Sequence, residues 1–503
     1  MNQANTDAIQ KAPGLRRFLL PSIGDVVFVV IFSVALMLGA GLTHRDGDFA
    51  KHLRVGQTIL EEGRLPTVDV YSHTMTGGEM VPYEWLAQTA FAATERWFGF
   101  DGLGVLTALV SALPWAILYR WLVKRGTPIF LSVVLALLGA AASMIHWAAR
   151  PHMFTWLFVV VWVILLEDLR RGNRAQVWAL LPLAMIWVNT HGGFIVGYIL
   201  IGTYLFGSLV NGLLDNKSDR GRDYAIAKHL SIVLVGIVAL SFVNPRGFQV
   251  VAHPFLHLLG DDFLFDFTRE FNSPDFHNLF FWPFLAMILL TVLLSFRWHP
   301  TTLLLAAFWT LSGLYSFRNI PLYALVLTPI IADAITPLWR AIRLTAVSPR
   351  WRDLAAMERH VVGGSLSIVL IAFTMFSMTR SADSAYQFSQ PPFPVEAVET
   401  VEESLPGSRV FNQFIWGGYL AYCCHPHIPV FIDGQTDYYG PELTREYDRA
   451  IRGLPGWREV FRDNGIDWVL ISPETGLAQV LTEAGDWVES YRDETAVIFV
   501  PSS

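Results

Sequence analysis

Acidic side chains gather in one polar stretch, residues 43–100, directly after the first apolar segment of the chain. Asp46 and Asp48 lie two positions apart at its start, and Glu84 lies in PYEWLAQ, where the chain becomes apolar again. A carboxylate in this setting can act as a general base toward a hydroxyl or amine, or bind a divalent cation. The alternatives are structural: Asp48 caps the following helix, and Glu84 lies at a helix N-terminus, where the dipole favours an acid.

Basic and imidazole side chains occupy three short polar turns further along the chain. Arg150 and His152 share one turn, His191 precedes two glycines in the second, and Arg318 lies in the third. Such groups bind phosphate or pyrophosphate, and glycine lets the backbone come close to a ligand. Taken singly, each side chain is better explained as snorkelling to lipid headgroups or fixing a tight turn. Three such turns on the side of the acids nevertheless favour a shared polar cavity.

Metal and nucleotide motifs are weak or absent in the sequence. His253 and His257, in the loop 244–278, are four residues apart without the intervening glutamate of zinc proteases, so we expect no metal at this pair. The loop either completes the cavity, covers it as a lid, or is an ordinary solvated loop. No glycine-rich phosphate-binding loop and no G-x-S-x-G elbow occurs, which argues against a nucleotide-driven pump. A divalent cation held by the outer-face acids stays open.

Composition places these residues in a membrane protein. Of 503 residues, 53% are hydrophobic and 16% are charged, whereas a soluble domain has about 25% charged residues. Apolar segments of roughly 20 residues can cross a bilayer, and we expect about eleven of them. They lie near 22–42, 101–123, 127–146, 152–168, 176–190, 193–213, 229–243, 279–296, 301–316, 320–338 and 361–379.

The distribution of Lys and Arg sets the expected orientation, because cytoplasmic loops carry the excess of positive charge. With the N-terminus in the cytoplasm, most basic clusters fall on the cytoplasmic side, whereas 43–100, 244–278 and the C-terminal region fall outside. We therefore expect a multi-pass protein of the inner (plasma) membrane with an uncleaved first helix. Two amphipathic segments, 48–62 and 84–99, are expected to lie in the membrane interface.

The C-terminal region differs in composition, because charge rises from about residue 380 and prolines mark a linker. We expect a transmembrane domain, 1–380, that includes the first outer loop 43–100, and an extracytoplasmic domain, 381–503. Short apolar runs alternate there with helical segments, which indicates a small α/β domain with a partly parallel sheet attached to a mostly α protein. The expected strands are 409–411, 430–432, 467–471, 487–491 and 496–500, and the expected helices are 441–452, 456–464 and 477–484.

Three residues of this C-terminal region are candidates for binding an acceptor. Asp433 ends an expected strand, a common place for ligand binding in α/β domains, and Asp437 follows it. Trp416 precedes two glycines and can stack on a carbohydrate. The alternatives are a simple turn at Asp433 and a packing role for Trp416. Cys423 and Cys424 are adjacent, and we expect from them neither a disulfide nor a metal site.

The layout of the whole chain resembles one family. The first outer loop carries DGDFAKHL, GRLPTVDVYSHT and YEWLAQ, many apolar segments follow, and the C-terminal region carries VFNQFIWGGYL and PVFIDGQTDYYG. This arrangement resembles the GT-C superfamily of integral membrane glycosyltransferases, and within it the bacterial relatives of the protein mannosyltransferase and aminoarabinose transferase type. A glycine here separates the two aspartates where protein mannosyltransferases have adjacent Asp-Glu, and the Trp-Trp-Asp signature of oligosaccharyltransferases is absent.

The resemblance implies transfer of a sugar from a polyprenyl-phosphate donor to a glycan, lipid or protein acceptor outside the cytoplasm. By this likeness Asp46 or Asp48 matches the catalytic base of the family, and Glu84 is a third catalytic candidate. The departing phosphate needs cationic groups around it, and the four basic and imidazole residues of the short turns are our candidates. No cofactor is implied with certainty, because only the divalent cation stays open.

Two other functions are compatible with the sequence. A transporter or flippase for a lipid-linked or anionic substrate often shows inverted repeats and broken helices near the middle of the membrane. This sequence shows no repeat, and its polar residues gather at one face, so we rank a transporter second. A non-catalytic envelope assembly protein would leave the outer-face acids unexplained.

Overall fold

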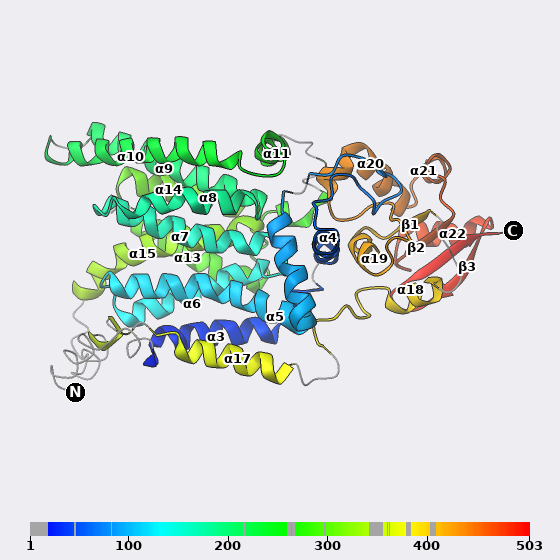
Figure 1. The fold of residues 1–503 in the computed structure, drawn as a ribbon, viewed down its shortest axis with the longest axis horizontal. Coiled ribbons are helices and arrows are strands. Elements are labelled where there is room, and N and C mark those ends of the chain that lie inside the picture. The colour runs from blue at the N-terminus through cyan, green and yellow to red at the C-terminus, as the bar shows by residue number, and fades with distance from the viewer. Residues whose placement is uncertain are drawn as a thin grey trace.

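A computed structural model describes residues 19–44, 47–81, 83–214, 217–258, 263, 267–295, 298–341, 356–359, 361, 363–378, 384–402 and 409–502. Asp46, one of the two expected bases, lies outside these residues, as do the basic residues before position 19 and those between 342 and 355. The described parts form a bundle of apolar helices with an α/β region at one of its ends (Figure 1).

The helices of the bundle run roughly along the long axis of the molecule (Figure 1). Their facing sides share one hydrophobic core, in which large rings such as Trp115, Trp162 and Trp187 are buried. Burial of such rings is the main source of stability in a helix bundle. The helices are α3 (Ile23–Met37), α5 (Trp85–Lys124), α6 (Ile129–Ser143), α7 (His152–Arg170), α8 (Leu180–Val188), α9 (Ile195–Leu214), α10 (Lys217–Ser241), α13 (Trp282–Leu294), α14 (Pro300–Tyr315), α15 (Ile320–Ala341) and α17 (Ser365–Met378).

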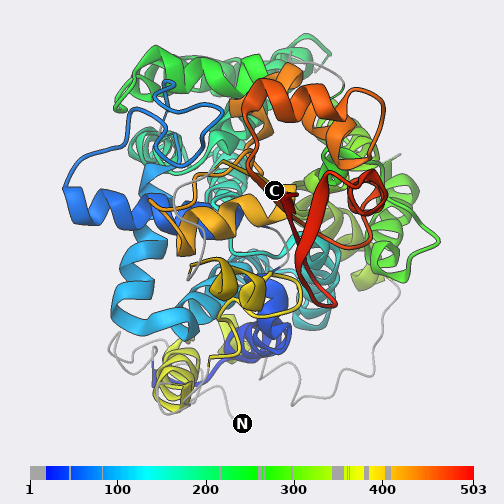
Figure 2. The same ribbon diagram turned by 90° about the vertical axis from the view of Figure 1, so that its right-hand side faces the viewer.

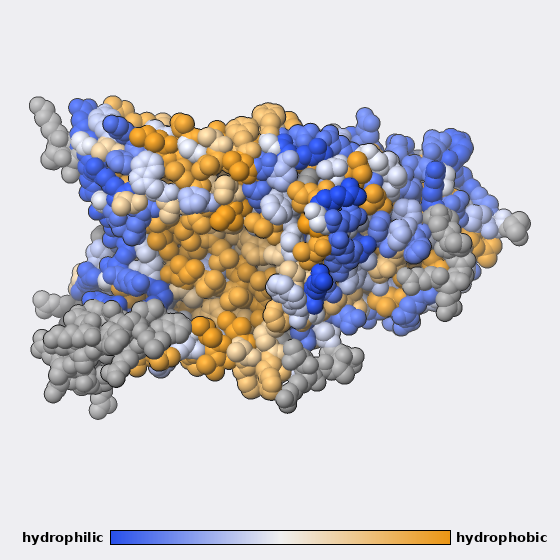
Figure 3. Space-filling view, in the orientation of Figure 1, coloured by the Kyte–Doolittle hydropathy of each residue, from blue (hydrophilic) through white to orange (hydrophobic). Residues whose placement is uncertain are grey.

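The expectation of about eleven membrane-spanning helices is too high. Among the described residues, 6 helices are long and apolar enough to cross a membrane. The expected segments do coincide with helices, but several of these apolar helices have only 10–17 residues, among them Ile23–Met37, Gln176–Val188 and Leu279–Leu294. On the face that Figure 3 shows, apolar residues cover the middle of the bundle, and hydrophilic residues gather toward its two ends. This is the surface of a membrane protein, and its orientation in the membrane stays a prediction.

Two helices cross the end of the bundle that faces the α/β region. Helix α5 bends at Gly99, whose φ of 64° and ψ of −165° are not helical, so its first part runs across the bundle end and its second part enters the bundle (Figure 1). Helix α4 (Asp48–Glu62) packs on the first part of α5 and buries Phe49 and Leu53 there. Both amphipathic segments expected from the sequence are therefore helices.

The C-terminal region contains a four-stranded sheet in the order β1-β2-β4-β3. Strands β1 and β2 are parallel, and the other two pairs are antiparallel, which confirms the expected partly parallel sheet. Figure 2 shows this region facing the viewer, in front of the helix bundle. Its elements are α18 (Val395–Glu402), β1 (Val410–Asn412), α19 (Gly417–Cys423), α20 (Thr436–Ile451), α21 (Trp457–Asn464), β2 (Trp468–Ile471), α22 (Gly476–Ala484), β3 (Trp487–Arg492) and β4 (Val497–Pro501).

One expected strand, 430–432, is not a strand of this sheet. The side chain of Asn412, in β1, donates to the carbonyl of Ile432 and accepts from the amide of Phe431, each at 2.8–2.9 Å. The side chain of Asn412 thus makes the hydrogen bonds that the backbone of a neighbouring strand would make to residues 431 and 432. Val430 instead forms a single bridge with Ser72 of the first outer loop.

The first outer loop and the C-terminal region are joined by several further contacts. The amide of His73 donates to the carbonyl of Val430, and the amide of Val430 donates to the carbonyl of Tyr71. The imidazole of His73 contacts the carbonyl of Val410 at 2.9 Å. The division into domains 1–380 and 381–503 stays a prediction, since the two parts share this extensive contact.

The expectation that Cys423 and Cys424 form no disulfide is wrong, because the two adjacent residues are joined by a vicinal disulfide.

Candidate functional site

The centre of the candidate site is the guanidinium of Arg150, between α6 and α7, which bridges two carboxylates. One nitrogen donates to Asp48 Oδ2 at 2.5 Å, and another donates to Glu270 Oε1. All three side chains are partly buried. Burial opposes ionisation of Glu270, but the charge of Arg150 lowers its pKa to about 2. Asp48 is the first residue of α4, and Gly47 occupies the N-cap position, so Asp48 is not the N-cap that the structural alternative assumed.

A third carboxylate, Glu84, is buried between two histidines. Its oxygens lie 3.5 Å from His52 Nδ1 and 3.5 Å from His191 Nε2. Burial raises the pKa of Glu84 to about 8, although Arg150 opposes the shift. Burial, together with Arg150, lowers the pKa of His52 to about 3. At neutral pH the group is therefore a protonated acid between two neutral imidazoles.

The tautomer of His191 follows from its hydrogen bonds. Its Nδ1 accepts from the amide of Gly193 at 2.9 Å and lies 2.9 Å from the hydroxyl of Thr155. The proton of the neutral ring is therefore on Nε2, which faces Glu84. Burial and the nearby charge of Arg318 hold the pKa of His191 well below its usual value.

Arg318 is a further cation of the site. Its guanidinium lies over the ring of Phe271, 5.2 Å from the ring centre. The hydroxyl of Ser316, two residues earlier, donates to the carbonyl of Glu270 at 2.8 Å, which fixes this turn beside the Arg150 bridge. No carboxylate pairs with Arg318 within the part of the chain that the structure describes. An unpaired guanidinium here can receive an anionic ligand.

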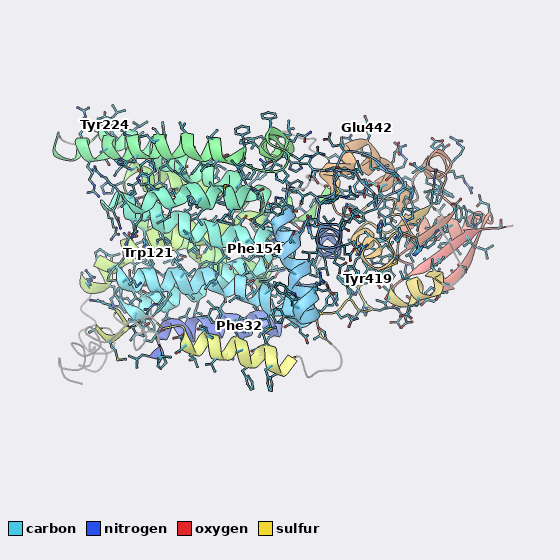
Figure 4. All side chains as sticks on the ribbon, viewed as in Figure 1. Phe32, Trp121, Phe154, Tyr224, Tyr419 and Glu442 are labelled. Atoms are coloured by element: carbon cyan, nitrogen blue, oxygen red, sulfur yellow. A yellow bond between two sulfur atoms is a disulfide. The ribbon has the colours of Figure 1, made fainter. Side chains whose placement is uncertain are left out.

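The C-terminal region approaches Asp48 so closely that only glycine fits. A Cβ atom at Gly434 would lie 1.4 Å from Asp48 Oδ1. A Cβ atom at Gly418 would lie 2.0 Å from the carbonyl oxygen of Gly47, immediately before Asp48. Phe154, near the start of α7, and Tyr419, on α19, lie on opposite sides of α4 (Figure 4). The start of α4 is therefore enclosed by the bundle on one side and by the C-terminal region on the other.

A buried ion pair fixes this contact. Lys51 Nζ, on α4, donates to Asp433 Oδ2 at 2.5 Å, and the two side chains are 3% and 0% exposed. The hydroxyl of Tyr439 donates to the same oxygen at 2.9 Å, and the amide of Gln435 donates to Oδ1 at 3.0 Å. Asp433 therefore has no free oxygen for an acceptor, and we interpret it as a residue that positions Gly434.

Replacing Lys51 by Met should strongly destabilise the protein, because the buried carboxylate of Asp433 would lose its counter-charge. We expect the free energy of unfolding to fall by about 3–5 kcal/mol. Thermal unfolding of the purified protein measures the change. The double variant Lys51→Met/Asp433→Asn removes the orphaned charge and should recover most of the loss. Equal unfolding temperatures for Lys51→Met and the unaltered protein would contradict this role.

Asp437 lies at the junction of the C-terminal region with α11 (Phe248–Leu258). His253 Nε2 contacts Asp437 Oδ2 at 2.8 Å, and the hydroxyl of Tyr83 donates to the same oxygen at 3.4 Å. The rings of Tyr83 and His253 are stacked, with centres 4.1 Å apart. The part of the loop 244–278 that forms α11 is thus attached to both the first outer loop and α20.

Two expected site residues are occupied by internal contacts. His152 Nε2 donates to the carbonyl of His146 at 3.1 Å, and the two rings stack with centres 4.1 Å apart. Trp416 is 2% exposed, and its indole N–H donates to the carbonyl of Pro392 at 2.9 Å. His152 therefore fixes the turn that carries Arg150, and Trp416 packs inside the C-terminal region.

Several residues of the site were not candidates at the start. Glu270 was only one of many polar residues in the loop 244–278, and Lys51 and His52 lay among the charges of an amphipathic helix. Their partners are far away in the sequence, and no local pattern signals such pairs. A turn at Asp433 was one alternative, and it would include Gly434. The doubled glycines after Trp416 were not interpreted as a sign of close backbone approach, although glycine permits it.

Among the described residues, the side chains of the site do not by themselves form a site for a divalent cation. The two carboxylates best placed to hold one, Asp48 and Glu270, are both bound to Arg150. In the described ranges, no group of three or more His, Cys, Asp or Glu side chains has the geometry of a metal site. The guanidinium of Arg150 supplies the positive charge between Asp48 and Glu270.

Two solved structures share this fold. The Archaeoglobus fulgidus oligosaccharyltransferase, tethered through a disulfide bond to an acceptor peptide with the NVT sequon, matches 95% of this chain and 74% of its own, with a TM-score of 0.55 and 13% identity. Its apo form matches 88% of this chain and 69% of its own, with a TM-score of 0.50 and 12% identity. No protein-family model and no curated protein matches the chain. The likeness confirms the GT-C type of fold expected from the sequence, and the bacterial subtype stays a prediction.

Proposed function

We propose that the protein is a membrane glycosyltransferase that moves a sugar from a polyprenyl-phosphate donor to an acceptor outside the cytoplasm. The observation that carries the proposal is the position of Asp48. Its carboxylate accepts a hydrogen bond from Arg150 on one side and lies against Gly434 on the other. This position is at the junction of an apolar bundle and a hydrophilic region. A lipid-linked donor and a water-soluble acceptor meet at such a junction.

In the proposed reaction, an oxygen or nitrogen of the acceptor attacks the anomeric carbon of the sugar. The bond from that carbon to the phosphate oxygen breaks, and the phosphate leaves with the electron pair. Asp48 accepts the proton of the acceptor group as the general base. Arg318 and the Nε2–H of His191 stabilise the negative charge of the departing phosphate. One base and one departing phosphate complete the reaction, so no second ionised carboxylate is needed.

Glu84 contributes to this reaction as a neutral acid. Because its pKa is raised to about 8, it carries no charge at neutral pH and does not repel the donor phosphate. Its proton can be donated in a hydrogen bond to a phosphate oxygen. The acceptor is a glycan, a lipid or a protein, and the acceptor peptide in the neighbouring structure supports the protein among these. Orientation of the C-terminal region away from the cytoplasm belongs to the proposal.

The pH dependence of transfer tests the role of Glu84. We expect activity to fall as the pH rises through about 8, because ionised Glu84 repels the phosphate. Glu84→Gln keeps a neutral donor and should remove this alkaline decline while keeping activity at neutral pH. The stability effect has the same sign: the protonated folded state is favoured below the ordinary pKa of 4.5, and this contribution is lost as the pH rises to about 8. If the activity of Glu84→Gln still fell at alkaline pH, the decline would have to come from the ionisation of another group.

The function itself is tested with the purified full-length protein in lipid. It is incubated with radiolabelled polyprenyl-phosphate sugars of different sugar type, together with membrane extract as a source of acceptors, and released polyprenyl phosphate is measured. Release from at least one donor is expected. Saturable donor binding without release from any member of the panel would contradict the transferase and favour a transporter.

A further inference from the structure

A polar cavity lies at the end of the bundle away from the C-terminal region. It has a volume of about 430 Å³ and is formed by α7, α9, α10, α14 and α15. In Figure 4 the labelled residues Tyr224, on α10, and Trp121, on α5, mark this end of the molecule. The cavity is separated from the Arg150 bridge by the length of the bundle, so the proposed transfer reaction does not use it.

Two buried polar atoms at the cavity have no partner among the described residues. The first is Oδ1 of Asn211, a side chain that is only 9% exposed. Its other amide atom, Nδ2, donates to Thr301 Oγ1 at 3.2 Å, which fixes the orientation of the group. The second is the indole Nε1 of Trp298. A buried polar atom without a partner is unfavourable, so the acceptor Asn211 Oδ1 and the donor Trp298 Nε1 are both available to bind a ligand here.

The charges around the cavity are unequal in their pairing. Arg170 donates to Glu167 at 2.8 Å, and Arg171 donates to Asp333 at 2.7 Å, so these acids are neutralised. Arg222 donates to the backbone carbonyl of Arg170 and has no carboxylate partner within the described part of the chain. Asp223 also lines the cavity beside Arg222, so the lining has as many acids as arginines. The cavity therefore offers, at its rim, one guanidinium that no described carboxylate pairs with, and neutral hydrogen-bonding groups inside.

Phosphate and hydroxyl groups match these two features. A guanidinium binds phosphate oxygens through charge-assisted hydrogen bonds. A hydroxyl can donate to Asn211 Oδ1 and also accept from Trp298 Nε1. We propose that the cavity binds a phosphate ester that carries free hydroxyl groups, with its phosphate on Arg222 and a hydroxyl on Asn211. A phosphoglycerol lipid headgroup and a soluble phosphate ester share this chemistry.

Binding to purified full-length protein in phosphatidylcholine nanodiscs tests the proposal. One arm titrates glycerol 1-phosphate and measures heat. The other exchanges phosphatidylglycerol into the nanodiscs and measures, by native mass spectrometry, the lipid retained by the protein. Binding in the first arm identifies a soluble ester as sufficient, and binding only in the second identifies a lipid headgroup. Absence of binding in both arms would overturn the proposal.

Three variants locate the binding. Asn211→Leu removes the buried acceptor, and Arg222→Met removes the rim charge from an exposed position. Each should weaken binding at least tenfold. Arg174→Met removes the same charge from an exposed position outside the cavity and should change binding less than twofold. Equal losses of binding in Arg222→Met and Arg174→Met would mean that binding depends only on general surface charge. That result would overturn the assigned site.

Discussion

Asp48→Asn is expected to lower the rate of polyprenyl phosphate release about 10²–10⁴-fold, the usual contribution of a general base. The amide keeps the size of the carboxylate and can still face Gly434, but it cannot accept the proton. The KM for the donor should change little, because Arg318 and His191 bind the phosphate. Initial rates with purified protein at several donor concentrations separate the two parameters.

The unfolding temperature of Asp48→Asn supplies the control, since it should stay close to that of the unaltered protein. A matched variant is Asp101→Asn, an acid in the second part of α5 whose carboxylate bonds the hydroxyl of Ser384. It should keep nearly full activity. Full activity in Asp48→Asn would contradict the assignment of Asp48 as the general base. Asp46 or Glu84 would then be the remaining candidates for that role.

Arg150→Met is expected to damage both stability and activity. The guanidinium is shared by Asp48 and Glu270, so its removal leaves two partly buried carboxylates without their cation. We expect a loss of about 3 kcal/mol in the free energy of unfolding, the lower end for breaking a buried ion pair, because these side chains keep some access to water. Urea or thermal unfolding in detergent measures the change.

Arg150→Lys distinguishes geometry from charge. A lysine keeps the charge but cannot reach both carboxylates as a planar guanidinium does, so we expect most of the stability and little of the activity to return. Lower pH should also lessen the defect of Arg150→Met. The depressed pKa of Glu270 means that its ion pair contributes above pH 4.5 and is lost as the pH falls to about 2. If Arg150→Met were as stable as the unaltered protein at neutral pH, this would contradict the stabilising role of the Arg150 bridge between Asp48 and Glu270.

Much of the fold was accessible from the sequence because it depends on local patterns. Apolar segments became helices, the kink at Gly99 separated the interfacial and bundle parts of α5, and four of the five expected strands formed. The segment 430–432 failed as a strand because its backbone bonds go to the side chain of Asn412 and to the first outer loop. The number of spans was too high because the hydrophobicity of a segment does not reveal where its helix begins and ends, and several apolar helices have only 10–17 residues.

The site was only partly accessible for a related reason. Asp48 and Glu84 were candidates because acids at a membrane edge need partners, and Arg150 was a candidate for binding phosphate. The structure brings the three side chains together. Which group pairs with which depends on contacts between residues more than a hundred positions apart, as for Arg150 and Glu270. Sequence periodicity carries no information about such contacts.

The most direct test of the central claim is a double-mutant cycle on the single-turnover release of polyprenyl phosphate. It compares the unaltered protein, Asp48→Asn, Gly434→Ala and the double variant, with Gly202→Ala as control, because no described atom lies within 4 Å of a Cβ there. If Asp48 is the base and the C-terminal region positions it, Gly434→Ala should lower the rate at least tenfold in the unaltered background and less than twofold beside Asp48→Asn. Equal losses in both backgrounds, or none in either, would contradict a shared site.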